Sequence, residues 1–170
     1  MKIAIIDYKM SNMFSIKNAL DFLGFDCQIA SNYKTILEAD GAVLPGVGSF
    51  PEAMQHLKDL KLADVIKEFA SSGKPFMGIC LGLQLLFSRS TEFTDCEGLN
   101  IINGKVENLS KYIPNEPVPH VGWNTVKNNT LENPKNFAQA SKIMFRENEY
   151  YYYEAKITGH SDELLVDLGL

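Results

Sequence analysis

The 170-residue sequence has no long hydrophobic run and no excess of basic residues. No apolar stretch approaches the roughly 18 to 20 residues that cross a bilayer, and the first residues lack a signal-peptide core. Sixteen Lys and Arg stand against 21 Asp and Glu, a net charge of −5. Such a surface gains no counterion release from nucleic acid or anionic lipid. We therefore expect a cytoplasmic protein with no nucleic-acid and no membrane partner.

Cysteine is also scarce. Cys27, Cys80 and Cys96 are widely spaced and contain no C-x-x-C pair, so neither a disulfide framework nor a zinc site is indicated. The composition, 45% hydrophobic and 22% charged, is ordinary for a globular chain and predicts one domain over residues 1–170.

Apolar runs alternate with helical spacing in the first half of the chain. Strands are predicted at 2–6, 25–30, 41–44 and just before Cys80. Helices are predicted from about residue 11 to Gly24, and from a capping-box spacing at Ser49 and Glu52 to about Gly73. This order predicts an α/β fold: a mostly parallel sheet with helices on both faces.

Cys80 stands between the fourth strand and a predicted amphipathic helix. A helix N-terminus favours a thiolate, so Cys80 is a candidate nucleophile. Asp7, the loop at 45–48 and Cys80 each follow the carboxyl end of a strand, so we expect them along one edge of the sheet.

An attacking thiolate creates an oxyanion, which needs backbone donors. The N–H of Leu81 is one candidate. The N–H of Val47 is the second, because Gly46 and Gly48 let that loop approach closely. The alternative is that the loop is only a tight turn and Cys80 only a small buried hydrophobe.

Three segments carry a resemblance to a known family. They are Pro45-Gly46-Val47-Gly48, Gly78-Ile79-Cys80-Leu81-Gly82-Leu83-Gln84-Leu85-Leu86 and Pro119-His120-Val121-Gly122-Trp123-Asn124. Over residues 1–126 the sequence resembles the class I, triad-type glutamine amidotransferases, and among them most closely the glutaminase subunits of imidazole glycerol phosphate synthases. The resemblance implies a flavodoxin-like or Rossmann-like fold.

The resemblance also implies a reaction. Cys80 would attack the glutamine side-chain amide and form a γ-glutamyl thioester, with Val47 and Leu81 as oxyanion donors. Gly46, Gly48 and Gln84 would bind glutamine. The ammonia would pass to a (β/α)8-barrel synthase (cyclase) subunit, in histidine biosynthesis, with no cofactor and no metal. The family positions that face this partner match Asp7, Tyr8, Asn12 and Trp123.

Two departures from the family leave alternatives open. Lys9-Met10-Ser11-Asn12 stands where the family has Gly-Met-Gly-Asn, so an alternative partner is that of a paralogue serving sugar amidation for surface polysaccharides. The 170 residues also contain no His-Pro-Glu, the family's base and its orienting acid. A non-catalytic subunit is therefore a second hypothesis, and a different cysteine hydrolase or redox protein on the same scaffold is a third.

The sequence contains three histidines that could replace that base. His56 is predicted on a solvated helix face, and the resemblance gives His120 a structural or partner-facing role. His160, two residues before Asp162, copies the His-x-acid spacing and is the best candidate of the three. From Asn128 on, the sequence departs from the family, and we expect a truncated or diverged C-terminal part with one further strand at 150–153.

Overall fold

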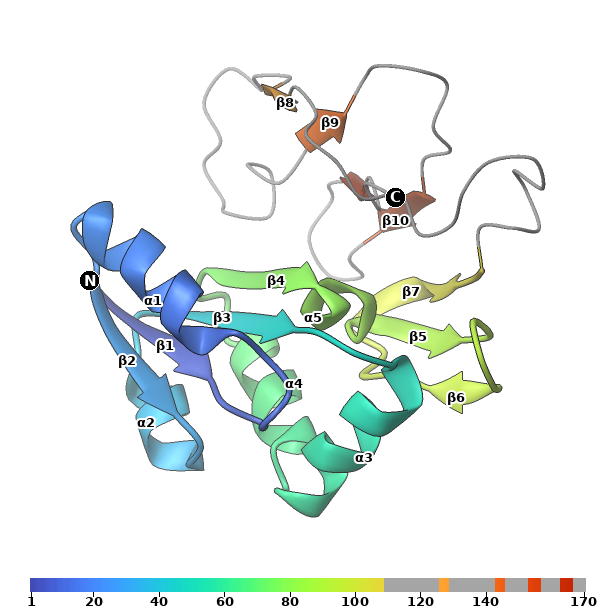
Figure 1. Cartoon of the computed structure of the whole chain (residues 1–170), viewed down its shortest axis with the longest axis horizontal. Coiled ribbons are helices and arrows are strands. Elements are labelled where there is room, and N and C mark those ends of the chain that lie inside the picture. The colour runs from blue at the N-terminus through green and yellow to red at the C-terminus, as the bar shows by residue number, and fades with distance from the viewer. Residues whose placement is uncertain (109–125, 129–142, 146–152, 157–162, 167–170) are drawn as a thin grey trace.

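The structure is a computed structural model that describes residues 1–108, 126–128, 143–145, 153–156 and 163–166. The first half of the chain forms a parallel sheet of four strands, β1 (Lys2–Ile6), β2 (Asp26–Ala30), β3 (Gly41–Gly46) and β4 (Phe76–Cys80). Their order is β2-β1-β3-β4, and every neighbouring pair is parallel (Figure 1). The predicted parallel sheet is confirmed.

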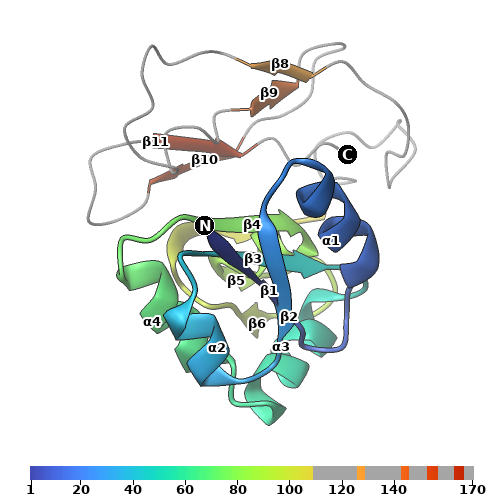
Figure 2. The ribbon, with the colours of Figure 1, turned by 90° about the vertical axis from the view of Figure 1, so that its left-hand side faces the viewer.

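Helices cover both faces of this sheet. Helix α1 (Met13–Phe22) lies on one face, and α2 (Tyr33–Glu38), α3 (Phe50–Asp59) and α4 (Ala63–Ser71) lie on the other (Figure 2). Successive side chains of each strand point to opposite faces of the sheet, so each strand contributes to both layers. In β1, Ile3 and Ile5 pack in the cluster beneath α1, whereas Ala4 and Ile6 join the larger core under the other helices.

The single helix predicted between Ser49 and Gly73 is wrong, because α3 and α4 are separate. Leu62 N–H donates to the Leu57 carbonyl at 2.8 Å and Lys61 N–H to the Lys58 carbonyl at 3.0 Å, which is a Schellman motif. Lys61 takes the left-handed conformation, φ 56°, that glycine usually occupies there. The sequence did not predict this helix end, because the left-handed position holds a lysine and not a glycine.

The predicted capping box is also not formed. Ser49 precedes α3, but its side chain makes no cap bond, and its hydroxyl lies 3.5 Å from a Glu52 carboxylate oxygen instead. The short helix α2 was not predicted from the sequence. Asn32 caps it by accepting a hydrogen bond from Thr35 N–H at 2.9 Å.

The amphipathic helix predicted after Cys80 is a single turn, α5 (Leu81–Gln84). The Leu85 carbonyl accepts from Leu99 N–H at 2.8 Å, and the Leu86 carbonyl accepts from Ile101 N–H at 2.8 Å. Because the chain arriving at residues 99–101 takes these carbonyls, the helix stops and β5 (Phe87–Ser90) follows.

A second sheet of seven strands continues from there. Its members are β5, β6 (Cys96–Glu97), β7 (Ile102–Val106), β8 (Val126–Asn128), β9 (Ile143–Phe145), β10 (Tyr153–Lys156) and β11 (Glu163–Val166). The strand predicted at 150–153 overlaps β10 at Tyr153 alone, and 150–152 lie outside the described residues. No helix within the described part is long and apolar enough to cross a bilayer.

Candidate active site

Three loops meet at the carboxyl edge of the first sheet. Strand β1 ends just before Asp7, β3 ends at Gly46 and β4 ends at Cys80. Gly46 and Cys80 are register partners in the parallel ladder, so the turn at residues 45–48 lies beside the cysteine. The predicted convergence on one edge is confirmed, and it places a thiol next to a glycine-rich backbone.

Cys80 has an unusual backbone conformation, φ 54° and ψ −123°, at the junction of β4 and α5. Non-glycine residues rarely adopt a positive φ, and such strain gathers at functional sites. The side chain of Cys80 is exposed. A sharp strand-to-helix turn that presents its side chain to solvent is the geometry of an enzymatic nucleophile.

Two glycines make this turn possible. A Cβ on Gly82 would collide with the Leu44 carbonyl oxygen, and one on Gly78 would lie 2.6 Å from Leu83 Cα. Backbone therefore packs on backbone on either side of Cys80. The sequence predicted a longer helix after Cys80, whose dipole would favour the thiolate. Because α5 is only one turn long, that dipole is small.

The two predicted oxyanion donors differ in their state. Leu81 is the first residue of α5, so its N–H has no partner within that helix. The Val47 N–H donates to the Met10 carbonyl at 2.9 Å, although its side chain is 54% exposed. Both assignments stay predictions, and Val47 can serve only after its bond to Met10 breaks.

The predicted glutamine-binding residues lie in the turn at residues 45–48 beside Cys80 and in helix α5 after it. Gly46 is buried against Tyr8, Gly82 and Leu81. Gly48 has φ +102°, which favours glycine. Gln84 is half-buried and is the last residue of α5. Their role in binding stays a prediction.

The residues predicted to face a partner behave differently from one another. Asn12 is exposed and caps α1, accepting from Ser15 N–H at 3.3 Å. Asp7 is buried and accepts hydrogen bonds from Lys9 N–H at 2.9 Å and Lys9 Nζ at 2.8 Å. Tyr8 is fully buried, so a partner-facing role for its side chain is wrong. Trp123 lies outside the described residues.

His56 is the only histidine in the described part of the chain. It is half-buried, less solvated than predicted, and its Nδ1 lies 3.2 Å from the Tyr8 carbonyl oxygen. It joins α3 to the loop after β1 and is not paired with Cys80. His120, His160 and Asp162 lie outside the described residues.

Sequence reasoning missed two groups of this site. They are the Met10 carbonyl that holds Val47 and the Tyr8 hydroxyl against Gly46. The Met10 oxygen belongs to the main chain, and a tyrosine after a buried strand is typical of a core residue. Neither has a sequence signal of its own.

Comparison with known proteins decides the family. The family model described as "Glutamine amidotransferase class-I" matches residues 4–164. The chain belongs to the class-I glutamine amidotransferase family. A solved structure titled "Crystal structure of glutamine amidotransferase" covers 62% of this chain and 55% of its own, with a TM-score of 0.53 and 16% identity. At that identity it supports the amidotransferase fold alone.

Three curated amidotransferases carry the name "Imidazole glycerol phosphate synthase subunit HisH". The protein of Listeria innocua is 52% identical over 128 residues, which are 74% of this chain and 60% of that protein. The protein of Bacillus cereus is 47% identical over 74% of this chain and 58% of its own length. That of Bacillus mycoides is 42% identical over 88% and 70%. The chain thus spans about 60% of the length of the first two relatives.

Proposed function

We propose that this chain is a glutamine-hydrolysing subunit that supplies ammonia to an imidazole glycerol phosphate synthase in histidine biosynthesis. The observation that carries the proposal is the strained, exposed Cys80 beside a glycine-rich backbone, in a chain that is 52% identical over 128 residues to a protein named for that synthase.

The chemistry follows from a thiolate at that position. The Cys80 sulfur attacks the side-chain carbonyl carbon of glutamine and forms a tetrahedral oxyanion, which the N–H groups of Leu81 and Val47 stabilise. The carbon–nitrogen bond then breaks, and the leaving nitrogen takes up a proton to depart as ammonia. Water attacks the γ-glutamyl thioester, releases glutamate and restores the thiol.

Gly46, Gly48 and Gln84 are proposed to bind the glutamine. Buried Gly46 and left-handed Gly48 present main-chain groups, and the amide of Gln84 can pair with the polar groups of the substrate. The leaving nitrogen also needs a proton donor. His160 with Asp162 stays the candidate from the sequence, since His56 is bonded to Tyr8.

The ammonia acceptor is proposed to be a (β/α)8-barrel synthase subunit. The names of the relatives support a synthase, and the family resemblance supports its barrel fold. Asn12, exposed at the start of α1 near the active-site edge, is a proposed contact with it.

A second function, a non-catalytic subunit that binds the synthase, is favoured by the absence of His-Pro-Glu from the 170 residues. Glutamate release from glutamine, measured with and without the barrel subunit, separates the two. Turnover that requires the barrel and disappears in Cys80→Ala supports the glutaminase. No glutamate with the barrel bound supports the non-catalytic subunit.

A further inference from the structure

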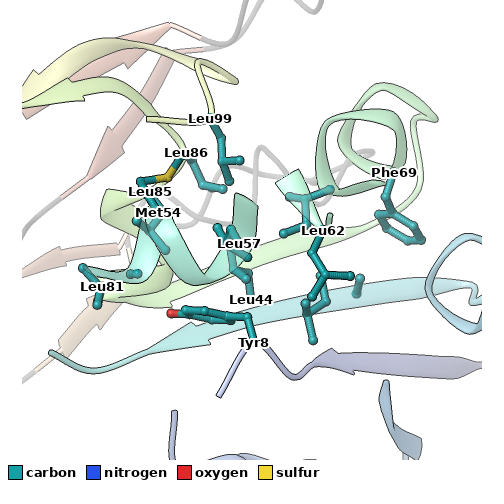
Figure 3. Packing of buried hydrophobic residues seen from close by; sticks show 14 of the residues in the cluster. Tyr8, Leu44, Met54, Leu57, Leu62, Phe69, Leu81, Leu85, Leu86 and Leu99 are labelled. Carbon is teal, nitrogen blue, oxygen red and sulfur yellow. The ribbon is translucent and has the colours of Figure 1, made fainter. Parts of the chain in front are cut away.

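The Tyr8 hydroxyl is a buried polar group without a hydrogen-bond partner among the described residues. Tyr8 is the largest fully buried side chain among the described residues, and its ring packs in the main core with Leu44 and Leu57. Figure 3 shows its oxygen at the end of the cluster where Leu81 lies. Buried hydroxyls are nearly always bonded, so an unbonded one next to a reactive site needs an explanation.

The hydroxyl lies where the two donor loops touch. A Cβ built on Gly46 would collide with Tyr8 Oη and would lie 2.7 Å from Gly82 N and 3.0 Å from Leu81 Cβ. Gly46 precedes Val47, and Gly82 follows Leu81. Tyr8 therefore sits behind the peptides that carry both proposed oxyanion donors.

One of those peptides must turn for the site to work. The Val47 N–H is bonded to the Met10 carbonyl. The N–H and C=O of a trans peptide point in opposite directions, so turning the Val47 N–H toward the Cys80 side swings the Gly46 carbonyl toward the loop after β1. Gly46 is buried, so this carbonyl needs a new hydrogen-bond donor.

We propose that Tyr8 is a positioning residue whose hydroxyl donates to the Gly46 carbonyl when the Gly46–Val47 peptide turns its N–H toward the substrate. Tyr8 belongs to the same loop as Met10, and it touches Gly46 from within the core. Burial and, secondarily, the charge of Cys80 raise the pKa of Tyr8, so the hydroxyl keeps its proton for donation.

The proposal rests on the proposed glutaminase function, because it assigns Tyr8 a part in forming the oxyanion site. If Tyr8 only fills the core, its oxygen is dispensable. Tyr8→Phe removes that oxygen and keeps the ring, and we expect its melting temperature to be unchanged or raised, since an unpaired buried hydroxyl is lost. Tyr33→Phe is the matched control, because Tyr33 is 65% exposed on α2.

The first measurement is hydrogen exchange of the Val47 amide in the full chain by NMR. The Val47 N–H exchanges with water when the peptide is turned. Without the Tyr8 hydroxyl the turned peptide is less populated, so exchange in Tyr8→Phe is about three- to tenfold slower, the value of one hydrogen bond. Tyr33→Phe keeps the wild-type rate. An unchanged Val47 rate in Tyr8→Phe overturns the proposal.

The second measurement is glutamine turnover with the barrel subunit bound. Tyr8→Phe lowers kcat by about three- to tenfold and leaves KM unchanged, because the donor acts only after the peptide turns. A wild-type kcat in Tyr8→Phe also overturns the proposal. If the wild-type chain itself releases no glutamate, the proposed function fails, and the Val47 exchange rate still decides the role of Tyr8.

Discussion

The main-chain N–H of Val47 donates a hydrogen bond to the carbonyl oxygen of Met10, across the gap between the loop after β3 and the loop after β1. The side chain of Met10 reaches the same turn, since a Cβ on Gly48 would lie 2.9 Å from its Cε. Two loops far apart in the sequence are therefore coupled beside Cys80, and the state of one donor depends on both.

Gly48→Ala is expected to disturb this coupling. Gly48 has φ +102°, so alanine adds about 1–2 kcal/mol of backbone strain and also presses on Met10. We expect lower stability in chemical denaturation and lower glutamine turnover. A variant with wild-type stability and turnover would contradict the left-handed turn described at this position.

At position 9, glycine is expected to give a more stable protein than alanine. It has φ 73°, and its ammonium bonds the buried Asp7 carboxylate at 2.8 Å while 62% of its side chain stays exposed. Both Lys9→Gly and Lys9→Ala lose this ion pair, so its contribution cancels when the two variants are compared. Only glycine relieves the backbone strain, so Lys9→Gly should be the more stable of the two by about 1 kcal/mol. Equal unfolding free energies of the two variants would disprove the left-handed assignment.

Gly82→Ala is expected to destabilise the fold strongly. Its Cβ would meet the Leu44 carbonyl, a main-chain group of the central sheet that cannot move aside. A loss of about 3 kcal/mol or more is expected, at the upper end for overpacking. Gly73→Ala is the comparison, because Gly73 has φ +76° but nothing within 4 Å, so strain alone acts there. The larger melting-temperature loss must belong to Gly82→Ala if the packing at the Cys80 turn is as described.

The three thiols are expected to react with iodoacetamide in the order Cys80, Cys96, Cys27. Cys80 is exposed, Cys96 is half-buried and Cys27 is buried. Burial also raises the pKa of the Cys96 and Cys27 thiols, which lowers their thiolate fraction at neutral pH. Mass spectrometry of partly labelled protein measures the order, and Cys80→Ser removes the fastest site. Labelling of Cys27 at the rate of Cys80 would count against the described burial.

Glu92→Gln is expected to stabilise the protein at neutral pH. Burial raises the pKa of Glu92, so the folded chain holds this proton more tightly than the unfolded chain does. The contribution of such a group to stability is complete below the unfolded pKa and is lost as pH rises through the folded pKa. The denaturation midpoint of Glu92→Gln should therefore exceed that of wild type at about pH 7 and match it at about pH 3. Glu68 is exposed on α4, so the denaturation midpoint of Glu68→Gln should not differ from that of wild type in this way.

The sequence predicted the alternation of strands and helices because it depends on local patterns. The apolar run at 2–6 became β1, and the helix predicted from about residue 11 to Gly24 became α1, with Asn12 as its cap. The placement of Gly46 beside Cys80 was also predictable, since parallel strands bring their carboxyl ends to one edge. Family membership followed from the same short segments.

Only the tertiary structure decided how these segments end and which groups they occupy. Helix α5 stops after one turn because distant residues, among them Leu99, bond the carbonyls it would need. Lys61 and Lys9 take a positive φ that is not predictable from a lysine side chain, because the surrounding contacts enforce it. The place of Cys80 and its neighbouring loop is therefore determined by the sequence, whereas the engaged Val47 N–H and the unbonded Tyr8 hydroxyl result from packing between residues far apart in the chain.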